Sequence, residues 1–167
     1  MLKLTKITIS TLVSASLFLS NVSYLKSQEI NKNTLPTGGT VESGNATITS
    51  NQSNLSVKQN SDKVILNWET FNIGRDASVE FFQPNSSSTA LNRVFASDPS
   101  HIYGSLKANG KLIFLNPSGV IFQGGSKVDV GAMIASSLNL SSENFLKDDY
   151  VFEKTNDING LIKNEGT

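Results

Sequence analysis

Short apolar runs, each followed by a turn signal, recur along the chain after its first quarter. Apolar and polar residues tend to alternate within these runs, which is the period of a half-buried β-strand. Gly-Gly, Asn-Gly and Pro-Ser-Gly sequences lie between them and are turn formers. The pattern predicts an all-β domain. Its expected strands cover residues 46–49, 55–58, 64–68, 79–82, 102–106, 111–115, 120–122, 128–130 and 150–152.

The strand spacing is compatible with a sandwich, a barrel or a parallel β-helix. Leu112, Val120 and Val128 lie eight residues apart, and Ile102 precedes them by ten. Two features favour the β-helix. Hairpin signals of the Asn-Gly type are few, and asparagine is frequent near the expected strand ends. Asparagine tolerates left-handed backbone and hydrogen-bonds its own main chain, which suits the repeated bends of stacked coils.

Residues 1–27 have the pattern of a secretory signal peptide. Lys3 and Lys6 precede an apolar stretch over 7–19, and these 13 residues are too short to span a bilayer as a stable anchor. Cleavage is expected near Ser23 or Ser27. Removal of residues 1–27 takes away Lys3, Lys6 and Lys26 but no acidic residue. A mature domain of residues 28–167 then has 11 basic and 14 acidic residues.

Composition argues against several classes of function. The chain has no cysteine, one histidine (His101) and no excess of basic residues, so thiol chemistry, a multi-histidine metal site and nucleic-acid binding are not expected. Aspartate and glutamate are scattered without recognisable acid/base spacing. We therefore predict a non-enzymatic protein without a cofactor. A carbohydrate-active β-helical lyase or hydrolase stays as the alternative, which a clustered carboxylate pair on one face would support.

Motifs between residues 65 and 138 are found in a fixed order. The sequence resembles the two-partner-secretion (TPS), or haemagglutination-activity, domain at the N-terminus of filamentous haemagglutinin-like proteins. Ser118 and Val120 replace the second Asn and the Ile of that family's signature. The motifs that carry the resemblance are ILNW at 65–68, FNIG at 71–74, FQP at 82–84, LNRV at 91–94, IYGSLKANG at 102–110, NPSGV at 116–120 and ASSL at 135–138.

The resemblance implies a right-handed parallel β-helix with an N-terminal β cap and extra antiparallel hairpins. It also implies Sec export to the periplasm of a Gram-negative bacterium, recognition by an outer-membrane β-barrel transporter, and a secreted or cell-surface adhesin. A host-cell or surface receptor would then be bound through a missing C-terminal region. A non-functional fragment of a truncated exoprotein gene is the remaining alternative.

The resemblance points to seven residues for transporter recognition or folding: Asn116, Pro117, Ser118, Gly119, Val120, Asn92 and Arg93. Residues 116–119 suit a tight turn, because Pro117 fixes φ, Gly119 permits positive φ, and the Asn116 side chain can bond the backbone two residues on. The requirements of a tight turn alone explain these residue types, so the sequence does not decide between a role in transporter recognition and a role in folding. Arg93 fits either a transporter contact or an edge residue.

The two ends of the domain also carry expectations. Residues 34–57 are predicted to cap the N-terminal coil, because open coil ends invite aggregation. Trp68 is expected to pack in the core rather than stack on a sugar. Residues 160–167 look like the start of a new coil, with Leu161 and Ile162 facing inward. The domain is therefore expected to be truncated, with fraying from about residue 156.

Overall fold

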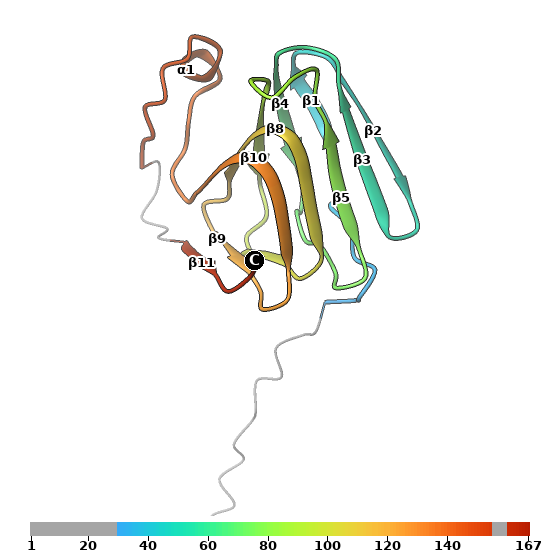
Figure 1. The fold of residues 1–167 in the computed structure, drawn as a ribbon. Helices are drawn as coiled ribbons and strands as arrows, with labels where there is room; N and C mark the ends of the chain where they lie inside the picture. Colours follow the sequence, from blue (N-terminus) through green and yellow to red (C-terminus); the bar gives the residue numbers. More distant parts are fainter. Residues whose placement is uncertain (1–29, 155–159) are drawn as a thin grey trace, which may run out of the picture.

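The computed structural model describes residues 30–154 and 160–167, and the predicted signal peptide lies outside this part of the chain. The described chain forms a parallel β-helix of about three turns (Figure 1), which confirms the predicted fold. Its elements, in chain order, are β1 (Thr40–Ser43), β2 (Ala46–Asn51), β3 (Asn54–Gln59), β4 (Lys63–Trp68), β5 (Ser78–Phe82), β6 (Thr89–Val94), β7 (Ser100–Ile102), β8 (Ser105–Leu115), β9 (Gly119–Phe122), β10 (Lys127–Ser136), α1 (Ser142–Leu146) and β11 (Leu161–Asn164).

Each coil contributes to three parallel faces. Face A contains β3, β5 and the first parts of β8 and β10. Face B contains β4, β6 and the second parts of β8 and β10. Face C contains β7, β9 and β11, and a single parallel bridge between Ile73 and Ile102 extends it to the first coil. The long strands β8 and β10 each turn the corner from face A to face B.

The inward side chains of the three faces form one apolar core. Trp68 and Phe71 meet edge to face with ring centroids 5.2 Å apart, and Phe71 meets Phe114 in the same way at 4.5 Å. Trp68 is 1% exposed, so its predicted place in the core is confirmed. Burial of such large apolar side chains stabilises the fold by roughly 1.5–3 kcal/mol each.

Antiparallel strands cover the N-terminal coil, as predicted, but the boundary differs. β1 pairs antiparallel with β4, and β2 pairs antiparallel with β3. Residues 54–57 belong to β3, which also pairs in parallel with β5 and so is part of the first coil. The expectation that the cap extends to residue 57 was therefore wrong for residues 54–57. In the β2–β3 hairpin, β2 belongs to the cap and β3 belongs to the first coil.

The segment 137–153, here called the strap, crosses the outside of face B and contains the only helix in the described residues. Ser141 caps α1, because its hydroxyl accepts a hydrogen bond from the Asn144 amide at 3.1 Å. Leu140 and Phe145 of the strap are both fully buried. They cover a second, outer apolar cluster formed by Ile65, Leu91, Ile113 and Leu115.

One predicted strand is absent because its residues belong to the strap. Residues 150–152 have no strand structure, and Tyr150 and Val151 are 43% and 47% exposed. The alternation in this run reflects Phe152, which packs against the outer cluster between exposed neighbours.

The C-terminal end of the β-helix has an apolar hollow of about 430 Å³, lined by Phe122, Met133 and Ile162 among others. Leu161 and Ile162 were expected to face inward together, and this was wrong. Ile162 lines the hollow, whereas the Leu161 side chain is 60% exposed. Successive side chains of a strand point to opposite sides, so two neighbours cannot both face the core.

Candidate functional site

The predicted signature forms the corner where β8 ends and β9 begins. Asn116 is fully buried, and its Oδ1 accepts a hydrogen bond from the Ser118 amide at 2.9 Å. This is the bond to the backbone two residues on that the sequence predicts. The Gly119 amide donates to the Asn116 carbonyl oxygen, also at 2.9 Å. Gly119 has a φ of +113°, which glycine adopts without the steric penalty of a side chain.

Asn116 also ties this corner to the preceding coil. Its Nδ2 donates to the Ser100 hydroxyl oxygen at 2.9 Å and to the Asp98 carbonyl oxygen at 3.3 Å. The Ser118 hydroxyl donates to the Ala96 carbonyl oxygen at 3.1 Å. A buried polar group that loses its partner costs about 1–3 kcal/mol, so Asn116 fixes the register of two successive coils.

The following coil covers the same corner from the other side. The Gly160 amide donates to the Pro117 carbonyl oxygen at 3.1 Å. A Cβ atom on Gly119 would lie 2.6 Å from the Leu161 carbonyl oxygen. Val120 is fully buried in the core. The signature asparagine can therefore contact another protein only before this corner has folded.

Asn92 lies inside the β-helix and not on a surface. It is fully buried, and its Oδ1 accepts a hydrogen bond from Trp68 Nε1 at 3.1 Å. Its Nδ2 lies 3.3 Å from the Ala90 carbonyl oxygen and 3.5 Å from that of Ile113. Asn92 thus gives the indole N–H of the core a partner, which a buried Trp requires.

Arg93 joins three segments that are distant in the sequence. Its Nη1 lies 3.0 Å from a Glu42 carboxylate oxygen of β1 and 3.0 Å from the Ser142 hydroxyl oxygen. Its Nη2 donates to the Leu140 carbonyl oxygen at 2.6 Å. The Ser142 hydroxyl also donates to the Glu42 carboxylate. With 13% of its side chain exposed, Arg93 connects cap, coil and strap.

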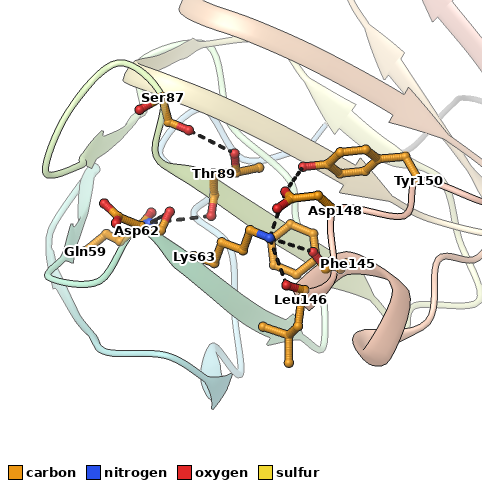
Figure 2. A network of polar contacts seen from close by, with 9 residues as sticks. All are labelled: Gln59, Asp62, Lys63, Ser87, Thr89, Phe145, Leu146, Asp148 and Tyr150. Atoms are coloured by element: carbon orange, nitrogen blue, oxygen red, sulfur yellow. Dashed lines mark hydrogen bonds and ion pairs between the residues drawn. The ribbon is translucent and has the colours of Figure 1, made fainter.

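Lys63 holds the other end of the strap, although the sequence does not mark it. Figure 2 shows its amine directed at the end of α1. The amine donates to the carbonyl oxygens of Phe145 at 3.2 Å and Leu146 at 2.9 Å, and it lies 2.7 Å from the Asp148 carboxylate. A cation at a helix C-terminus satisfies carbonyl groups that have no partner within the helix.

The corner between faces A and B contains a buried pair of glutamines that the sequence analysis did not single out. Gln83 Nε2 donates to Gln59 Oε1 at 3.1 Å, and both side chains are buried. Gln83 Oε1 accepts from the Gly110 amide at 2.9 Å, one coil further on. Gln83 belongs to the FQP motif, which could have drawn attention to it. Gln59 and Lys63 belong to no motif. Their partners become visible only in the structure, where Gln59 meets Gln83 of the next coil and Lys63 meets the strap.

The strap contacts depress the pKa of two carboxyl groups. The hydrogen bond from Ser142 is the main cause that lowers the pKa of Glu42, and Asn67 and Arg93 add to it while burial opposes it. The hydrogen bond from Lys63 is the main cause that lowers the pKa of Asp148, followed by that from Tyr150. Both carboxylates are therefore charged, and bonded to their partners, at neutral pH.

We predict that acid loosens the strap. A folded-state pKa below the unfolded value contributes stability that is present at higher pH and is lost as the pH falls through the folded-state pKa. Below about pH 4, the amide NMR signals of residues 140–152 should broaden or shift before those of β6 and β8. In Glu42→Gln the acid response should be smaller. Strap signals that are unchanged between pH 7 and pH 3 would contradict this.

The seven predicted residues do not form one surface. They lie at the corner, in the core and in the cap–strap connection. Within residues 30–154 and 160–167, no three histidine, aspartate or glutamate side chains come together as metal ligands would. His101 packs beside Tyr103, with ring centroids 6.2 Å apart, and its Nδ1 lies 3.0 Å from Gln123 Nε2. In the same described ranges no helix is long and apolar enough to cross a lipid bilayer.

Comparison with known proteins agrees with this architecture. Two heme/hemopexin-binding proteins of Haemophilus influenzae are similar to the chain. One is 41% identical over 92 residues, which are 54% of this chain and 10% of that protein. The other, from strain Rd, is 37% identical over 112 residues, which are 66% of this chain and 12% of that protein. The chain thus spans about a tenth of the length of these relatives.

A solved structure has the same fold. The HMW1 secretion domain from Haemophilus influenzae superposes with a TM-score of 0.74 at 31% sequence identity, over 78% of this chain and 35% of that chain. Residues 30–167 match the family model described as the TPS secretion domain. The chain therefore belongs to the TPS secretion domain family.

Proposed function

We propose that this secretion domain delivers a longer exoprotein to an outer-membrane β-barrel transporter of the two-partner type. The observation that carries the proposal is the family match over residues 30–167, on a β-helix like that of a solved secretion domain. A secretion domain implies such a transporter. That the full protein is a surface adhesin is part of the proposal, supported by its resemblance to haemagglutinin-like exoproteins.

The route to the transporter is also proposed. The Lys3/Lys6 n-region and the short apolar stretch support Sec export, cleavage within about residues 21–32, and passage through the periplasm of a Gram-negative bacterium. The exoprotein would cross the outer membrane in extended form. Coils that stack one on another would then fold outside and draw the chain forward.

The domain is proposed to act without catalysis and to continue into further coils. Action without catalysis is supported by the family, because TPS secretion domains are not a known enzyme family. The hollow lined by Phe122, Met133 and Ile162 is where an adjoining coil would stack. Such a coil would bury apolar side chains that otherwise meet water.

The test of this function is secretion of the full exoprotein with and without its outer-membrane transporter. Asn116→Ala should lower secretion several-fold, because the corner loses its bonds to Ser118, Asp98 and Ser100. Asn54→Ala is a matched control, since Asn54 is exposed and makes no side-chain hydrogen bond in the described part of the chain. Wild-type secretion of Asn116→Ala would show that the signature has no functional weight here.

A second variant separates folding from recognition. Ser100→Ala removes the partner of Asn116 Nδ2 but leaves residues 116–120 unchanged. If folding is the cause, Ser100→Ala and Asn116→Ala should lose secretion in proportion to their loss of thermal stability. If only Asn116→Ala lowers secretion at matched stability, the transporter reads the signature in the unfolded chain.

A further inference from the structure

Strand β8 carries an Asn-Gly pair at the corner between faces A and B. Its pairing with the preceding coil is interrupted there, because Ala108 is the last residue paired with β5 and Lys111 is the first paired with β6. Asn109 and Gly110 lie in this gap. Asparagine is a thermolabile residue, most of all before glycine, which has no Cβ atom to hinder attack by its backbone nitrogen.

The Asn109 side chain takes the place of the missing backbone pairing. Its Oδ1 accepts a hydrogen bond from the Gln83 amide at 2.7 Å, and its Nδ2 donates to the Gln83 carbonyl oxygen at 2.8 Å. Both bonds go to the backbone of one residue, so the side chain is held as a peptide group of a neighbouring strand would be. Asparagine is the shortest side chain that carries both an amide donor and a carbonyl acceptor.

The Gly110 backbone is enclosed by both neighbouring coils. Its N–H donates to Gln83 Oε1 at 2.9 Å, in a buried hydrogen bond. A Cβ atom on Gly110 would lie 2.7 Å from Gln83 Oε1 and 2.7 Å from the Ser88 carbonyl oxygen. On the other side, a Cβ atom on Gly131 would lie 2.7 Å from the Gly110 carbonyl oxygen. The fold therefore requires, at this corner, the pair of residues that deamidates most readily.

We propose that Asn109 is a deamidation site that is open in the unfolded chain and is closed when this corner folds. The inference does not depend on the proposed function. In the reaction the Gly110 nitrogen bonds to Asn109 Cγ, the Cγ–Nδ2 bond breaks, and the Gly110 amide proton leaves with the side-chain nitrogen as ammonia. The succinimide that results takes up one water molecule and opens to aspartate or isoaspartate.

The folded corner blocks the first step at both reacting groups. The Gly110 N–H is bound to Gln83 Oε1, so it is not free to give up its proton. The Asn109 amide is bound twice to the Gln83 backbone, so it cannot turn toward the Gly110 nitrogen. Three hydrogen bonds must open together before attack, and deamidation should therefore be slower than in the unfolded chain by about a hundredfold or more.

Deamidation before folding would damage the corner. Aspartate would place an acceptor oxygen against the Gln83 carbonyl oxygen, where Asn109 Nδ2 donates in the native chain. Isoaspartate carries the former side-chain carbon in the main chain, so β8 would gain one backbone atom between its pairs with β5 and β6. The time that the chain spends unfolded thus limits how much of it can still reach the native fold.

The test compares the purified chain in its folded state with the same chain unfolded in guanidinium chloride, at one neutral pH and one temperature. Peptide mapping by mass spectrometry follows the mass gain at Asn109, and chromatography separates isoaspartate from aspartate. Asn159–Gly160, the other Asn-Gly pair of the sequence, reports the rate of an unprotected pair in the unfolded sample. Equal rates at Asn109 in the folded and unfolded chain would overturn the inference, as would an unfolded chain in which Asn109 stays intact while Asn159 reacts.

Two glutamine variants identify the protecting contact. Gln83→Ala frees the Gly110 N–H and should speed deamidation of Asn109 in the folded chain by about tenfold. Gln59→Ala is the matched control, because it breaks the bond between the two glutamines but keeps the Gly110 bond. It should react at the wild-type rate. Equal acceleration in the two variants would mean that general stability and not this corner protects Asn109, which would overturn the assignment. The comparison of folded and unfolded wild type decides the case if Gln83→Ala does not fold.

Discussion

Replacing Gly104 with alanine should destabilise the domain by about 3 kcal/mol, the upper end of what overpacking a close-packed interior costs. Gly104 lies between β7 and β8, where it meets the backbone of the preceding coil. A Cβ atom there would lie 2.2 Å from the carbonyl oxygens of both Ala77 and Gly74. These are backbone atoms of the preceding coil, so they cannot move aside as a flexible side chain could. Urea denaturation of the purified chain measures the change.

A matched glycine provides the control. The nearest atom to a Cβ on Gly124 would be 4.0 Å away, and Gly124 has no positive φ. Gly124→Ala should therefore change the free energy of unfolding by less than about 0.5 kcal/mol. Equal stability of Gly104→Ala and Gly124→Ala would mean that the coils are not packed at the spacing described here.

Replacing Phe145 with alanine should detach the strap. Phe145 is the larger of the two fully buried strap side chains, and truncating a buried Phe typically costs about 3–5 kcal/mol. Because the strap lies outside the coils, we expect the loss as local opening, with the coils still folded. Hydrogen exchange of residues 140–153 should approach that of an unprotected chain, while β6 and β8 stay protected.

The neighbouring position tests whether this effect comes from burial. Leu146 is 46% exposed, and its contact with Lys63 uses the backbone carbonyl oxygen, which alanine keeps. Leu146→Ala should leave the strap protected. If Leu146→Ala opens the strap as far as Phe145→Ala does, burial of Phe145 in the outer cluster is not what holds this segment.

Much of the fold could be predicted from local pattern. Alternation predicted most strands of faces A and B, and the turn chemistry of Asn116 predicted its bond to the Ser118 amide. The prediction did not extend to Arg93, whose sequence neighbours say nothing about Glu42 or Ser142. Its role depends on which segment crosses face B, and that is decided by packing between residues far apart in the chain.

The predicted strand at residues 150–152 was wrong for a similar reason: local pattern cannot show that this stretch belongs to the strap. Ile65, Leu91 and Ile113 are apolar residues on the outer side of their strands, and local pattern cannot say what covers them. The cover comes from Leu140 and Phe145, in a stretch with one short helix and no strand. The apolar and polar alternation at 150–152 resembles that of a strand because Phe152 packs against the same apolar cluster while its neighbours are exposed.

The bond between Ser142 and Glu42 has a consequence for the order of folding, because its two residues are 100 positions apart. Closing a loop of that length costs about 1 kcal/mol more in chain entropy than joining neighbouring coils, and contacts of such high separation form late. In a chain that emerges with its N-terminus first, as transport of the kind proposed above would allow, the face B residues of the outer cluster are complete once Leu115 has appeared. They stay uncovered until Leu140 and Phe145 of the strap follow. The interval between these events is when such a chain would be most prone to aggregate.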